Sequence, residues 1–293
     1  MNAYFMAVLL GIVEGLTEFL PVSSTVHLRI AETLMKISPA DPYWAMCAIV
    51  LQLGAVLAMC LLLLGRIADF IRTFPQGEGR DRSWLTHPLS LILIAFAFTA
   101  APALLLHEWS EKNLGSPRAM ALALLIGGAA MWAVDAWSER REPGTHDVQQ
   151  MSLFQAVWIG LCQTISAVLP GTSRTMSTIT AGQMAGLTRP AALEFSFLLS
   201  IPTMIAATIW DFWKQIHPER AALAAAALPA HVAMNPQRWG ALFIGLIVSF
   251  VVALGVAEWF LVWVRRHGFA IFAVYRILLG GWLLFWGAKF IGG

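Results

Sequence analysis

The long apolar segments of this chain limit its fold more than any other feature. Six stretches have the pattern of complete membrane spans, at roughly residues 43–64, 88–107, 117–137, 191–212, 239–264 and 270–290. A helix of about 20 apolar residues crosses the hydrocarbon core of a bilayer. Only 12% of the residues are charged, whereas about a quarter are charged in soluble domains. The sequence therefore predicts an all-α polytopic membrane protein with six transmembrane helices in a single domain, residues 1–293.

Two more apolar segments do not have the pattern of a span. Residues 3–36 and 152–186 each begin apolar, break at a proline and continue through a run of hydroxyl residues. Irregular backbone at membrane depth is tolerated only where protein or a water-filled cavity satisfies its polar groups. We therefore predict two re-entrant helical hairpins. The polar segments 72–84 and 138–147 are expected to be aqueous loops, and 217–239 a surface helix or loop.

The two predicted hairpins are related in sequence. They align without gaps at an offset of 149 residues, which places GIVEGLTEFLPVSST (11–25) on GLCQTISAVLPGTSR (160–174) and pairs Gly11 with Gly160, Glu14 with Gln163 and Ser24 with Ser173. Each half, approximately 1–149 and 150–293, then holds one hairpin and three spans. Because three is odd, the second half starts on the opposite face, which predicts an inverted-topology repeat whose hairpins meet near the midplane. Paired interrupted segments of this kind typically form the binding site.

Two carboxylates lie in the first hairpin. Glu14 and Glu18 are four residues apart, so a helix places both on one face. Carboxylates inside a membrane are costly to maintain and usually functional. As a pair they could bind a hard divalent cation, or one of them could act as a base. The alternative is a pair of helix-end carboxylates that contact water at the membrane interface.

Hydroxyl residues and a histidine follow the carboxylates, in the segment PVSSTVH (21–27). Ser23, Ser24 and Thr25 stand where a second helix begins, so they could cap free backbone N–H groups or bind an anion at that terminus. For Ser23 alone we favour capping. His27 lies one turn beyond the hydroxyls and near the carboxylates, which favours an acid or base role over that of a structural histidine.

The second hairpin repeats this arrangement in PGTSRTMST (170–178). Its hydroxyl residues surround Arg174, a permanent cation in an otherwise apolar segment. The guanidinium fork fits phosphate oxygens, or it could form an internal ion pair with Glu14 or Glu18. Together the hairpins supply the carboxylates, hydroxyls, histidine, helix N-termini and arginine that phosphate chemistry requires. The predicted phosphate-binding residues are Ser23, Thr25, Thr172, Ser173, Arg174 and Thr178.

Four other polar residues also lie within apolar segments. Each of them could line the same cavity or bond another helix. The sequence does not decide between these roles for Gln52, Glu194, Ser196 and Arg276.

In these motifs the chain resembles the bacterial undecaprenyl-diphosphate phosphatase family, also called bacitracin-resistance proteins. The matching motifs run in order through both halves: EGLTEFLPVSSTVHL (14–28), VLQLGAVL (50–57), PGTSRTMSTI (170–179), EFSFLLSIP (194–202) and YRILLGG (275–281). The resemblance implies hydrolysis of undecaprenyl diphosphate to undecaprenyl phosphate, which recycles the lipid carrier for peptidoglycan. It implies resistance to bacitracin, which sequesters the diphosphate, a divalent-cation cofactor (Mg or Ca) and a site open to the periplasmic side. The functional residues it implies are Glu14, Glu18, Ser24, Thr25, His27, Ser173 and Arg174.

The chain departs from the pattern of this family at three positions. The family usually has Gly before the histidine, where this chain has Val26. It usually has Ser-Gly after the arginine, where this chain has Thr175 and Met176. We expect Met176 to fill volume beside the phosphate pocket and so to alter the pocket's shape or its preferred lipid.

These inferences combine into one mechanistic hypothesis. The isoprenoid tail lies among the apolar spans, and the diphosphate lies between the hairpins on Arg174 and the two helix N-termini. Glu14 and Glu18 bind the metal, and His27 is the general acid or base. Ser24 is either the nucleophile or a phosphate ligand, because the sequence does not choose between a phosphoseryl intermediate and attack by metal-activated water.

Two other classes of function compete with this hypothesis. A polyprenyl-phosphate transporter or flippase would share the inverted repeat, whereas a structural membrane protein would leave the intramembrane charges without a role.

The expected partners are the polyprenyl diphosphate lipid and the bilayer; the net charge of +2 suggests no nucleic acid, and a homodimer stays open. The expected location is the bacterial plasma (inner) membrane. Nine Lys and Arg in loops on the far side, against seven on the side of the termini, favour termini outside the cytoplasm.

Overall fold

A computed structural model describes residues 2–38, 41–77, 83–114, 116–142, 144–216 and 234–290. These ranges are almost entirely helical. The helices are α1 (Ala3–Thr17), α2 (Ser24–Leu34), α3 (Pro42–Leu62), α4 (Leu64–Thr73), α5 (Pro88–Leu114), α6 (Pro117–Ser138), the 3-10 helix η1 (Val148–Gln150), α7 (Leu153–Val168), α8 (Arg174–Met184), α9 (Arg189–Ile216), α11 (Pro236–Val264) and α12 (Ala270–Phe290). Most of the predicted surface segment 217–239 lies outside the described residues.

The six predicted spans are confirmed by six helices that are long and apolar enough to cross a membrane. Their spanning parts are Pro42–Leu62, Pro88–Leu106, Pro117–Ser138, Arg189–Trp210, Pro236–Val264 and Ala270–Gly287. Three of these helices start in the same way, with a side-chain oxygen at the N-cap and a proline next to it: Asp41 before α3, Ser116 before α6 and Asn235 before α11. Such a cap accepts a free backbone N–H, and the proline lacks one. For this reason α11 begins at Pro236, three residues before the predicted start of its span.

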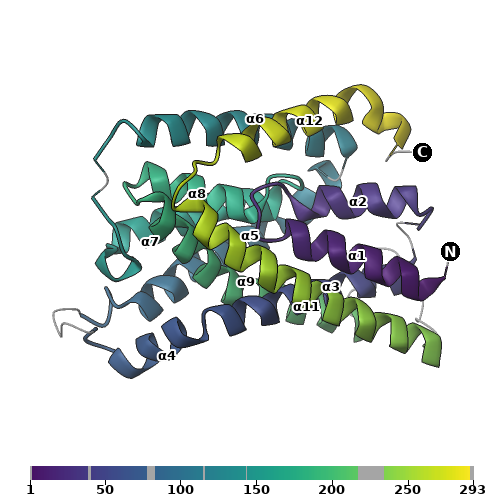
Figure 1. Cartoon of the computed structure of the whole chain (residues 1–293), viewed down its shortest axis with the longest axis horizontal. Helices are drawn as coiled ribbons and strands as arrows, with labels where there is room; N and C mark the ends of the chain where they lie inside the picture. The colour runs from purple at the N-terminus through teal and green to yellow at the C-terminus, as the bar shows by residue number, and fades with distance from the viewer. Residues whose placement is uncertain are drawn as a thin grey trace.

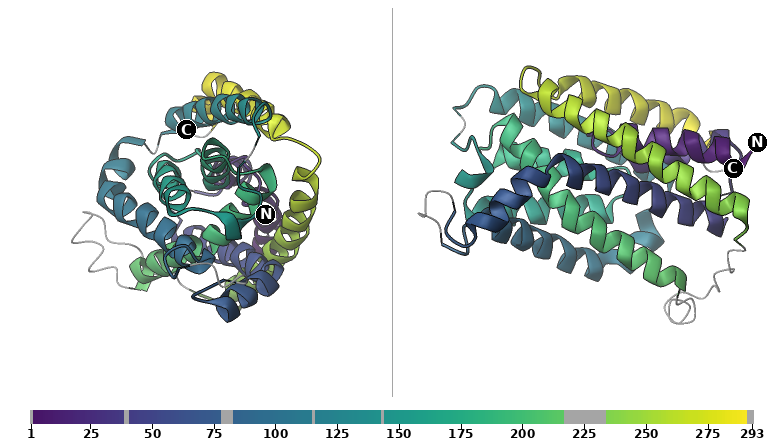
Figure 2. Two further views of the ribbon diagram at one scale, coloured as in Figure 1. Left: turned by 90° about the vertical axis from the view of Figure 1, so that its left-hand side faces the viewer. Right: turned by 60° about the horizontal axis from the view of Figure 1, so that its bottom comes forward.

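The two predicted hairpins are present as pairs of short helices. The pair α1–α2 lies toward the end of the bundle that holds both chain termini, and α7–α8 lies toward the other end (Figure 1). Seen along the bundle, α7 and α8 lie inside a ring of longer helices (Figure 2). This arrangement is compatible with re-entrant hairpins that enter from opposite faces.

The packing of the two hairpins is compatible with the predicted inverted repeat. Helix α1 packs along α11 of the second half, and α7 packs along α5 of the first half. A Cβ at Gly11 would lie 2.8 Å from the carbonyl oxygen of Gly245, and one at Gly160 would lie 2.3 Å from that of Ala95. The paired glycines therefore have the same structural role, because each lets two helix backbones approach closely.

The two halves lose their common register at the hairpin turns. Helix α2 begins at Ser24, but α8 begins at Arg174, which is an offset of 150 rather than 149 residues. The structural counterpart of Ser23 is therefore Ser173, and the predicted pairing of Ser24 with Ser173 is wrong. A gapless alignment could not detect this shift, because α7 ends two residues beyond the counterpart of the end of α1, whereas the turn before α8 is one residue shorter.

Helix α4 was not predicted, since most of its residues lie between the predicted span 43–64 and the predicted loop 72–84. Arg66 holds it in place by donating from Nε to Glu194 over 2.7 Å and from Nη2 to Asp147 over 2.8 Å. Of the two roles left open for Glu194, the structure supports the bond to another helix.

Candidate active site

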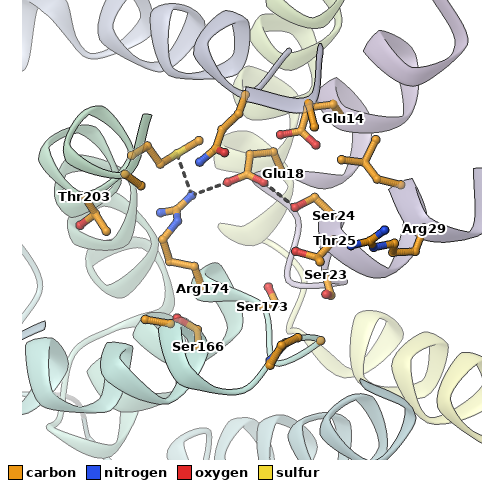
Figure 3. A pocket seen from close by; sticks show the side chains of 18 of the residues that line it. Glu14, Glu18, Ser23, Ser24, Thr25, Arg29, Ser166, Ser173, Arg174 and Thr203 are labelled. Carbon is orange, nitrogen blue, oxygen red and sulfur yellow. Dashed lines mark hydrogen bonds and ion pairs between the residues drawn. The ribbon is translucent and has the colours of Figure 1, made fainter. Parts of the chain in front are cut away.

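The tips of both hairpins border one cavity of about 440 Å³ (Figure 3). Its wall also includes the first half of α3, from Trp44 to Gln52, and the later part of α9, from Thr203 to Ala207. Of the predicted site residues, those that line it are Glu14, Glu18, Ser23, Ser24, Thr25, Ser173 and Arg174. The sequence therefore identified about half of the polar residues of the cavity, including residues contributed by both halves.

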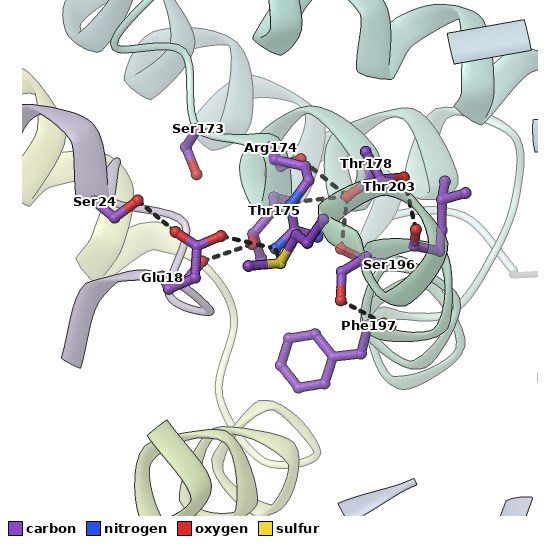
Figure 4. A network of polar contacts seen from close by, with 12 residues as sticks. Glu18, Ser24, Ser173, Arg174, Thr175, Thr178, Ser196, Phe197 and Thr203 are labelled. Atoms are coloured by element: carbon purple, nitrogen blue, oxygen red, sulfur yellow. Dashed lines mark hydrogen bonds and ion pairs between the residues drawn. The ribbon is translucent and has the colours of Figure 1, made fainter. Parts of the chain in front are cut away.

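Glu18 connects the two hairpins. One carboxylate oxygen accepts a hydrogen bond from Ser24 Oγ over 2.5 Å, and the other accepts one from Arg174 Nη2 over 3.2 Å (Figure 4). The hydroxyl of Thr175 donates to the Glu18 backbone carbonyl over 3.3 Å. The Arg174 and Glu18 side chains are only 13% and 11% exposed. The internal ion pair that the sequence left as an alternative thus forms with Glu18, and it places a hydroxyl, a base and a cation side by side.

Several buried polar atoms of the cavity residues have no hydrogen-bond partner among the described residues. They are Glu14 Oε2, Gln163 Oε1 and Arg174 Nη1. Glu14 and Gln163 are 2% and 1% exposed, and they are the pair that the sequence alignment placed at the same position of the two hairpins. Burying a polar group without a partner is costly, so these atoms mark places where a ligand would be stabilised.

The turn of each hairpin contains a serine with left-handed backbone. Ser23 has φ 76° and Ser173 has φ 59°, and each is the N-cap of the second helix of its hairpin. Such a conformation costs an L-residue roughly 1–2 kcal/mol and clusters at functional sites. Ser173 Oγ accepts from the backbone N–H of Met176, whereas the Ser23 side chain makes no capping bond. The expectation that Ser23 caps α2 through its hydroxyl is therefore wrong, and this hydroxyl lies on the cavity wall.

His27 lies outside the lining of the cavity. Its Nδ1 is 2.7 Å from the carbonyl oxygen of Ser23, and its Nε2 is 2.6 Å from the hydroxyl of Tyr275 on α12. The imidazole also stacks on the Tyr275 ring at 5.7 Å between centroids. Because both ring nitrogens are engaged away from the cavity, the geometry favours a role in positioning the start of α2.

Two of the predicted phosphate-binding threonines also lie outside the cavity lining. The hydroxyl of Thr178 is 2.6 Å from that of Ser196 on α9, and the Thr178 side chain is 1% exposed. Thr172 is 5% exposed, and its carbonyl oxygen accepts a hydrogen bond from Arg276. The hydroxyl of Thr178 therefore joins two helices, which is the role that the sequence had left open for Ser196.

Arg276 holds the two hairpin turns together. Its side chain is fully buried, and Nη1 donates to the carbonyl of Pro21 in the first turn over 3.2 Å. Nη2 is 3.3 Å from the carbonyl oxygens of Gly171 and Thr172 in the second turn and 3.2 Å from that of Ala123 on α6. The sequence left open whether Arg276 lines the cavity or bonds another helix, and the structure supports the second role.

Comparison with known proteins identifies the family of this chain. The family described as "Bacitracin resistance protein BacA" matches residues 7–282. The chain belongs to this family. An undecaprenyl-diphosphatase of Koribacter versatilis is 53% identical over 289 residues, covering 99% of this chain and all of that protein. Undecaprenyl-diphosphatases of Bradyrhizobium sp. (strain ORS 278) and Thermus thermophilus are each 38% identical, covering 96% and 93% of both chains, respectively.

The three departures from the pattern of the bacitracin resistance family have structural explanations. Val26 is fully buried in a cluster with residues of α6 and α12, and the hydroxyl of Thr175 donates to the first hairpin. Met176 is 5% exposed and packs against Gly127, where a Cβ would lie 2.6 Å from the Met176 methyl group. Met176 was expected to fill volume beside the phosphate pocket; its side chain points toward α6 and is not part of the cavity lining.

Some residues that line the cavity were not predicted from the sequence. Arg29 and Glu32 on α2 line the cavity and form an ion pair of 3.6 Å. Thr203 on α9 also lines it, and its hydroxyl accepts a hydrogen bond from Gln163 Nε2 and donates one to the Leu199 carbonyl. The sequence did contain a signal for Arg29 and Glu32. Charged residues at spacing i and i+3 on a hairpin helix share a face, and Arg29 lies one turn after the hydroxyl residues at the start of that helix. Nothing local distinguishes Thr203, which reaches the site only through the packing of α9.

The residues present fit a divalent cation. Among the described residues no group of three or more His, Cys, Asp or Glu side chains could hold a metal ion. Glu14 and Glu18 nevertheless supply two carboxylates in one cavity, and one Glu14 oxygen lacks any partner. Mg²⁺ is commonly bound by one or two carboxylates together with substrate phosphates, so two carboxylates are a sufficient protein contribution.

Proposed function

We propose that this chain hydrolyses undecaprenyl diphosphate to undecaprenyl phosphate and inorganic phosphate in the bacterial inner membrane. The reaction would recycle the lipid carrier for peptidoglycan synthesis and confer resistance to bacitracin. The observation that carries the proposal is the bridge in which Glu18 accepts hydrogen bonds from Ser24 and Arg174 inside one cavity. The relatives named above are undecaprenyl-diphosphatases, and their names do not favour the transporter alternative.

The phosphates bind between the hairpin tips in this proposal. Arg174 keeps its contact to Glu18 through Nη2 and offers Nη1, which has no partner among the described residues, to a phosphate oxygen. The N-termini of α2 and α8 add backbone N–H groups and a favourable dipole. The isoprenoid tail leaves the cavity toward α3 and α9. Because the cavity extends to Trp44 and Ala45 near the start of α3, it opens at the end of the bundle that holds the termini, which we assign to the periplasmic side.

Ser24 is placed for nucleophilic attack. Its Oγ already donates to Glu18 over 2.5 Å, so the carboxylate can take the hydroxyl proton as Oγ bonds to the terminal phosphorus. The bond from that phosphorus to the bridging oxygen breaks, and undecaprenyl phosphate leaves. Water then hydrolyses the phosphoserine. Direct attack by water with Glu18 as its base gives the same products, so a trapping experiment must decide.

The Ser24→Ala variant is expected to lose about 1000-fold or more in kcat if Oγ is the nucleophile. Substrate labelled in its terminal phosphate should leave label on Ser24 of the otherwise intact protein after rapid acid quenching. Ser166 is a matched control, because it lines the same cavity but donates its hydroxyl to the Gln163 carbonyl. Ser166→Ala should retain activity. A fully active Ser24→Ala protein would rule out the phosphoseryl route.

His27 has a positioning role in this proposal. It contacts the Ser23 carbonyl on one side and Tyr275 on the other, so it fixes the turn that presents Ser24. Glu18 rather than His27 is the base next to the reacting hydroxyl.

The proposed cofactor is a divalent cation, Mg or Ca, held by Glu14 and Glu18. When bound, it neutralises negative charge that develops on the phosphoryl oxygens. Purified protein in detergent should release phosphate from undecaprenyl diphosphate when a divalent cation is present, and a chelator should abolish the release.

The Glu14→Gln variant tests the cation site and the function together. It removes one carboxylate while keeping the side-chain volume, so the cation concentration for half-maximal activity should rise about tenfold or more. Gln163 lines the cavity at the paired position, and Gln163→Ala should keep the cation dependence of the unaltered protein. An unchanged cation dependence in Glu14→Gln would refute this assignment, and absence of phosphate release from the unaltered protein would refute the function.

Arg29 is proposed as a second contact for the diphosphate, at the mouth of the cavity. Its side chain is 41% exposed and its pairing with Glu32 is loose, at 3.6 Å, so a phosphate could replace the carboxylate at little cost. Arg29→Gln should raise KM about 3- to 10-fold with kcat nearly unchanged, as expected for a contact made equally in ground and transition states. Arg118→Gln removes the same charge outside the cavity and should leave KM unchanged. Equal KM values in the two variants would contradict the assignment.

A further inference from the structure

A second cavity lies at the other end of the bundle. It has a volume of about 380 Å³ and is formed by the ends of α6, α8 and α11 and the start of α9. Helix α9 touches both cavities, this one at Arg189 and the active cavity at Thr203. Fourteen residues of helix separate them, which corresponds to about 21 Å. The second cavity is therefore a separate site and plays no part in the chemistry proposed above.

The floor of this cavity is a fixed network around Asp135. This carboxylate, 3% exposed, accepts hydrogen bonds from Arg189 Nε over 2.7 Å, Gln183 Nε2 over 2.8 Å and the backbone N–H of Phe269 over 2.8 Å. These bonds tie α6, α8, α9 and the connection between α11 and α12 together. The charge of Arg189 is balanced here, and the shape of the floor is set without any ligand.

Three further arginines line the same cavity with their charge unbalanced. Arg141, Arg265 and Arg266 are exposed. Arg141 lies over the Trp137 ring at 4.1 Å, but within the described ranges none of the three side chains forms an ion pair or donates a hydrogen bond. The acidic side chains in the lining are Glu139, which lies 3.6 Å from Arg189, and Glu142. Positive charge therefore exceeds negative charge on this wall.

A simpler explanation for the arginines is their place after helix C-termini. Arg141 follows the end of α6, and Arg265 and Arg266 follow the end of α11, where a cation is favoured by the helix dipole. That role usually includes hydrogen bonds to the last carbonyl groups. None is formed by these three side chains in the described part of the chain, so the dipole accounts for their charge but leaves their donors unused.

We propose that this basic cavity binds a phosphate group, carried by an anionic lipid headgroup or present as free phosphate. Guanidinium groups bind phosphate oxygens through paired N–H donors. Basic pockets between the ends of transmembrane helices on the cytoplasmic side are suited to lipid headgroups, and this end of the bundle lies opposite the one that we assign to the periplasmic side. The ordered floor supports the site, while the free arginines at its rim supply the binding donors.

The test compares two double variants of the full chain in detergent. Arg265→Gln with Arg266→Gln removes two donors from the cavity. Arg72→Gln with Arg140→Gln removes the same charge at the same end of the bundle, from side chains that do not line the cavity. Short-chain phosphatidylglycerol, phosphatidylcholine and inorganic phosphate are titrated separately, with bound ligand counted by native mass spectrometry and with the thermal unfolding midpoint as a second readout.

The unaltered protein and the control double variant should bind phosphatidylglycerol in preference to phosphatidylcholine. The cavity double variant should bind phosphatidylglycerol at least about tenfold more weakly than the unaltered protein does. Binding of inorganic phosphate with the same loss in the cavity variant also supports the proposal and identifies free phosphate as the ligand. Equal binding by all three proteins, or an equal loss in both double variants, would overturn it. Glu142→Gln removes a negative charge from the lining and should strengthen binding; no change would likewise count against the site. Phosphate release from undecaprenyl diphosphate verifies that each variant is folded.

Discussion

Arg174→Ala should lower kcat/KM for undecaprenyl diphosphate hydrolysis by about 1000-fold or more, the range found for arginines that stabilise phosphoryl transfer. The substitution removes the guanidinium donor nearest the reacting groups and leaves Glu18, 11% exposed, without its cation. An unpaired carboxylate in this position would repel the diphosphate. The measurement is release of inorganic phosphate by purified protein in detergent at saturating divalent cation.

Arg174→Lys is the matched variant for this prediction. Lysine keeps the charge but lacks the planar fork that can contact Glu18 and a phosphate oxygen together. It should recover part of the activity, mainly in KM. A double-mutant cycle with Glu18→Ala adds a second test, because contacting residues are non-additive. The double variant should lose much less than the product of the two single losses. Substantial activity in Arg174→Ala would exclude the arginine from transition-state stabilisation.

The parts of the fold that depend on local sequence were predicted well. The six spans were confirmed because their apolar runs are long, and three of them also start with a cap followed by proline. The pairing of Gly11 with Gly160 was also informative, since both glycines allow close contact with a helix of the other half. What failed was the register at the hairpin turns, where a difference of one residue depends on how far α7 extends before the backbone reverses.

The residues of the candidate site also divide into those that local sequence predicted and those that it did not. Glu14, Glu18, Ser24 and Arg174 share one cavity because each is fixed by the geometry of its own hairpin. The positions of His27 and Thr178 could not be predicted, because their partners Tyr275 and Ser196 belong to other helices. A side chain at the start of a short helix can turn toward the cavity or toward a neighbouring helix, and the choice depends on long-range packing.

Arg276→Met should produce the largest loss of stability. The arginine is fully buried and lies within 3.3 Å of four carbonyl oxygens, those of Pro21, Ala123, Gly171 and Thr172. Methionine fits the volume but leaves these acceptors unsatisfied. Removing one partner of a buried charged network typically costs about 3–5 kcal/mol. The thermal unfolding midpoint in detergent should fall markedly, whereas Arg72→Met, at a side chain that is 79% exposed, should change it little.

The same substitution should reduce activity in the protein that remains folded, because Arg276 is the one described side chain that donates to carbonyls of both hairpin turns. Without it, the tips that carry Ser24 and Arg174 are no longer held at a fixed separation. This predicts a fall in kcat of about 100-fold, the usual consequence of a misplacement of about 1 Å, measured below the unfolding temperature and normalised to folded protein. Arg276→Lys retains the charge and one donor group, so it should be intermediate in both stability and kcat. If the folded fraction of Arg276→Met kept the kcat of the unaltered protein, the contact between the turns would be structural only, and the separation of the hairpin tips would be set by the packing of α1 on α11 and α7 on α5.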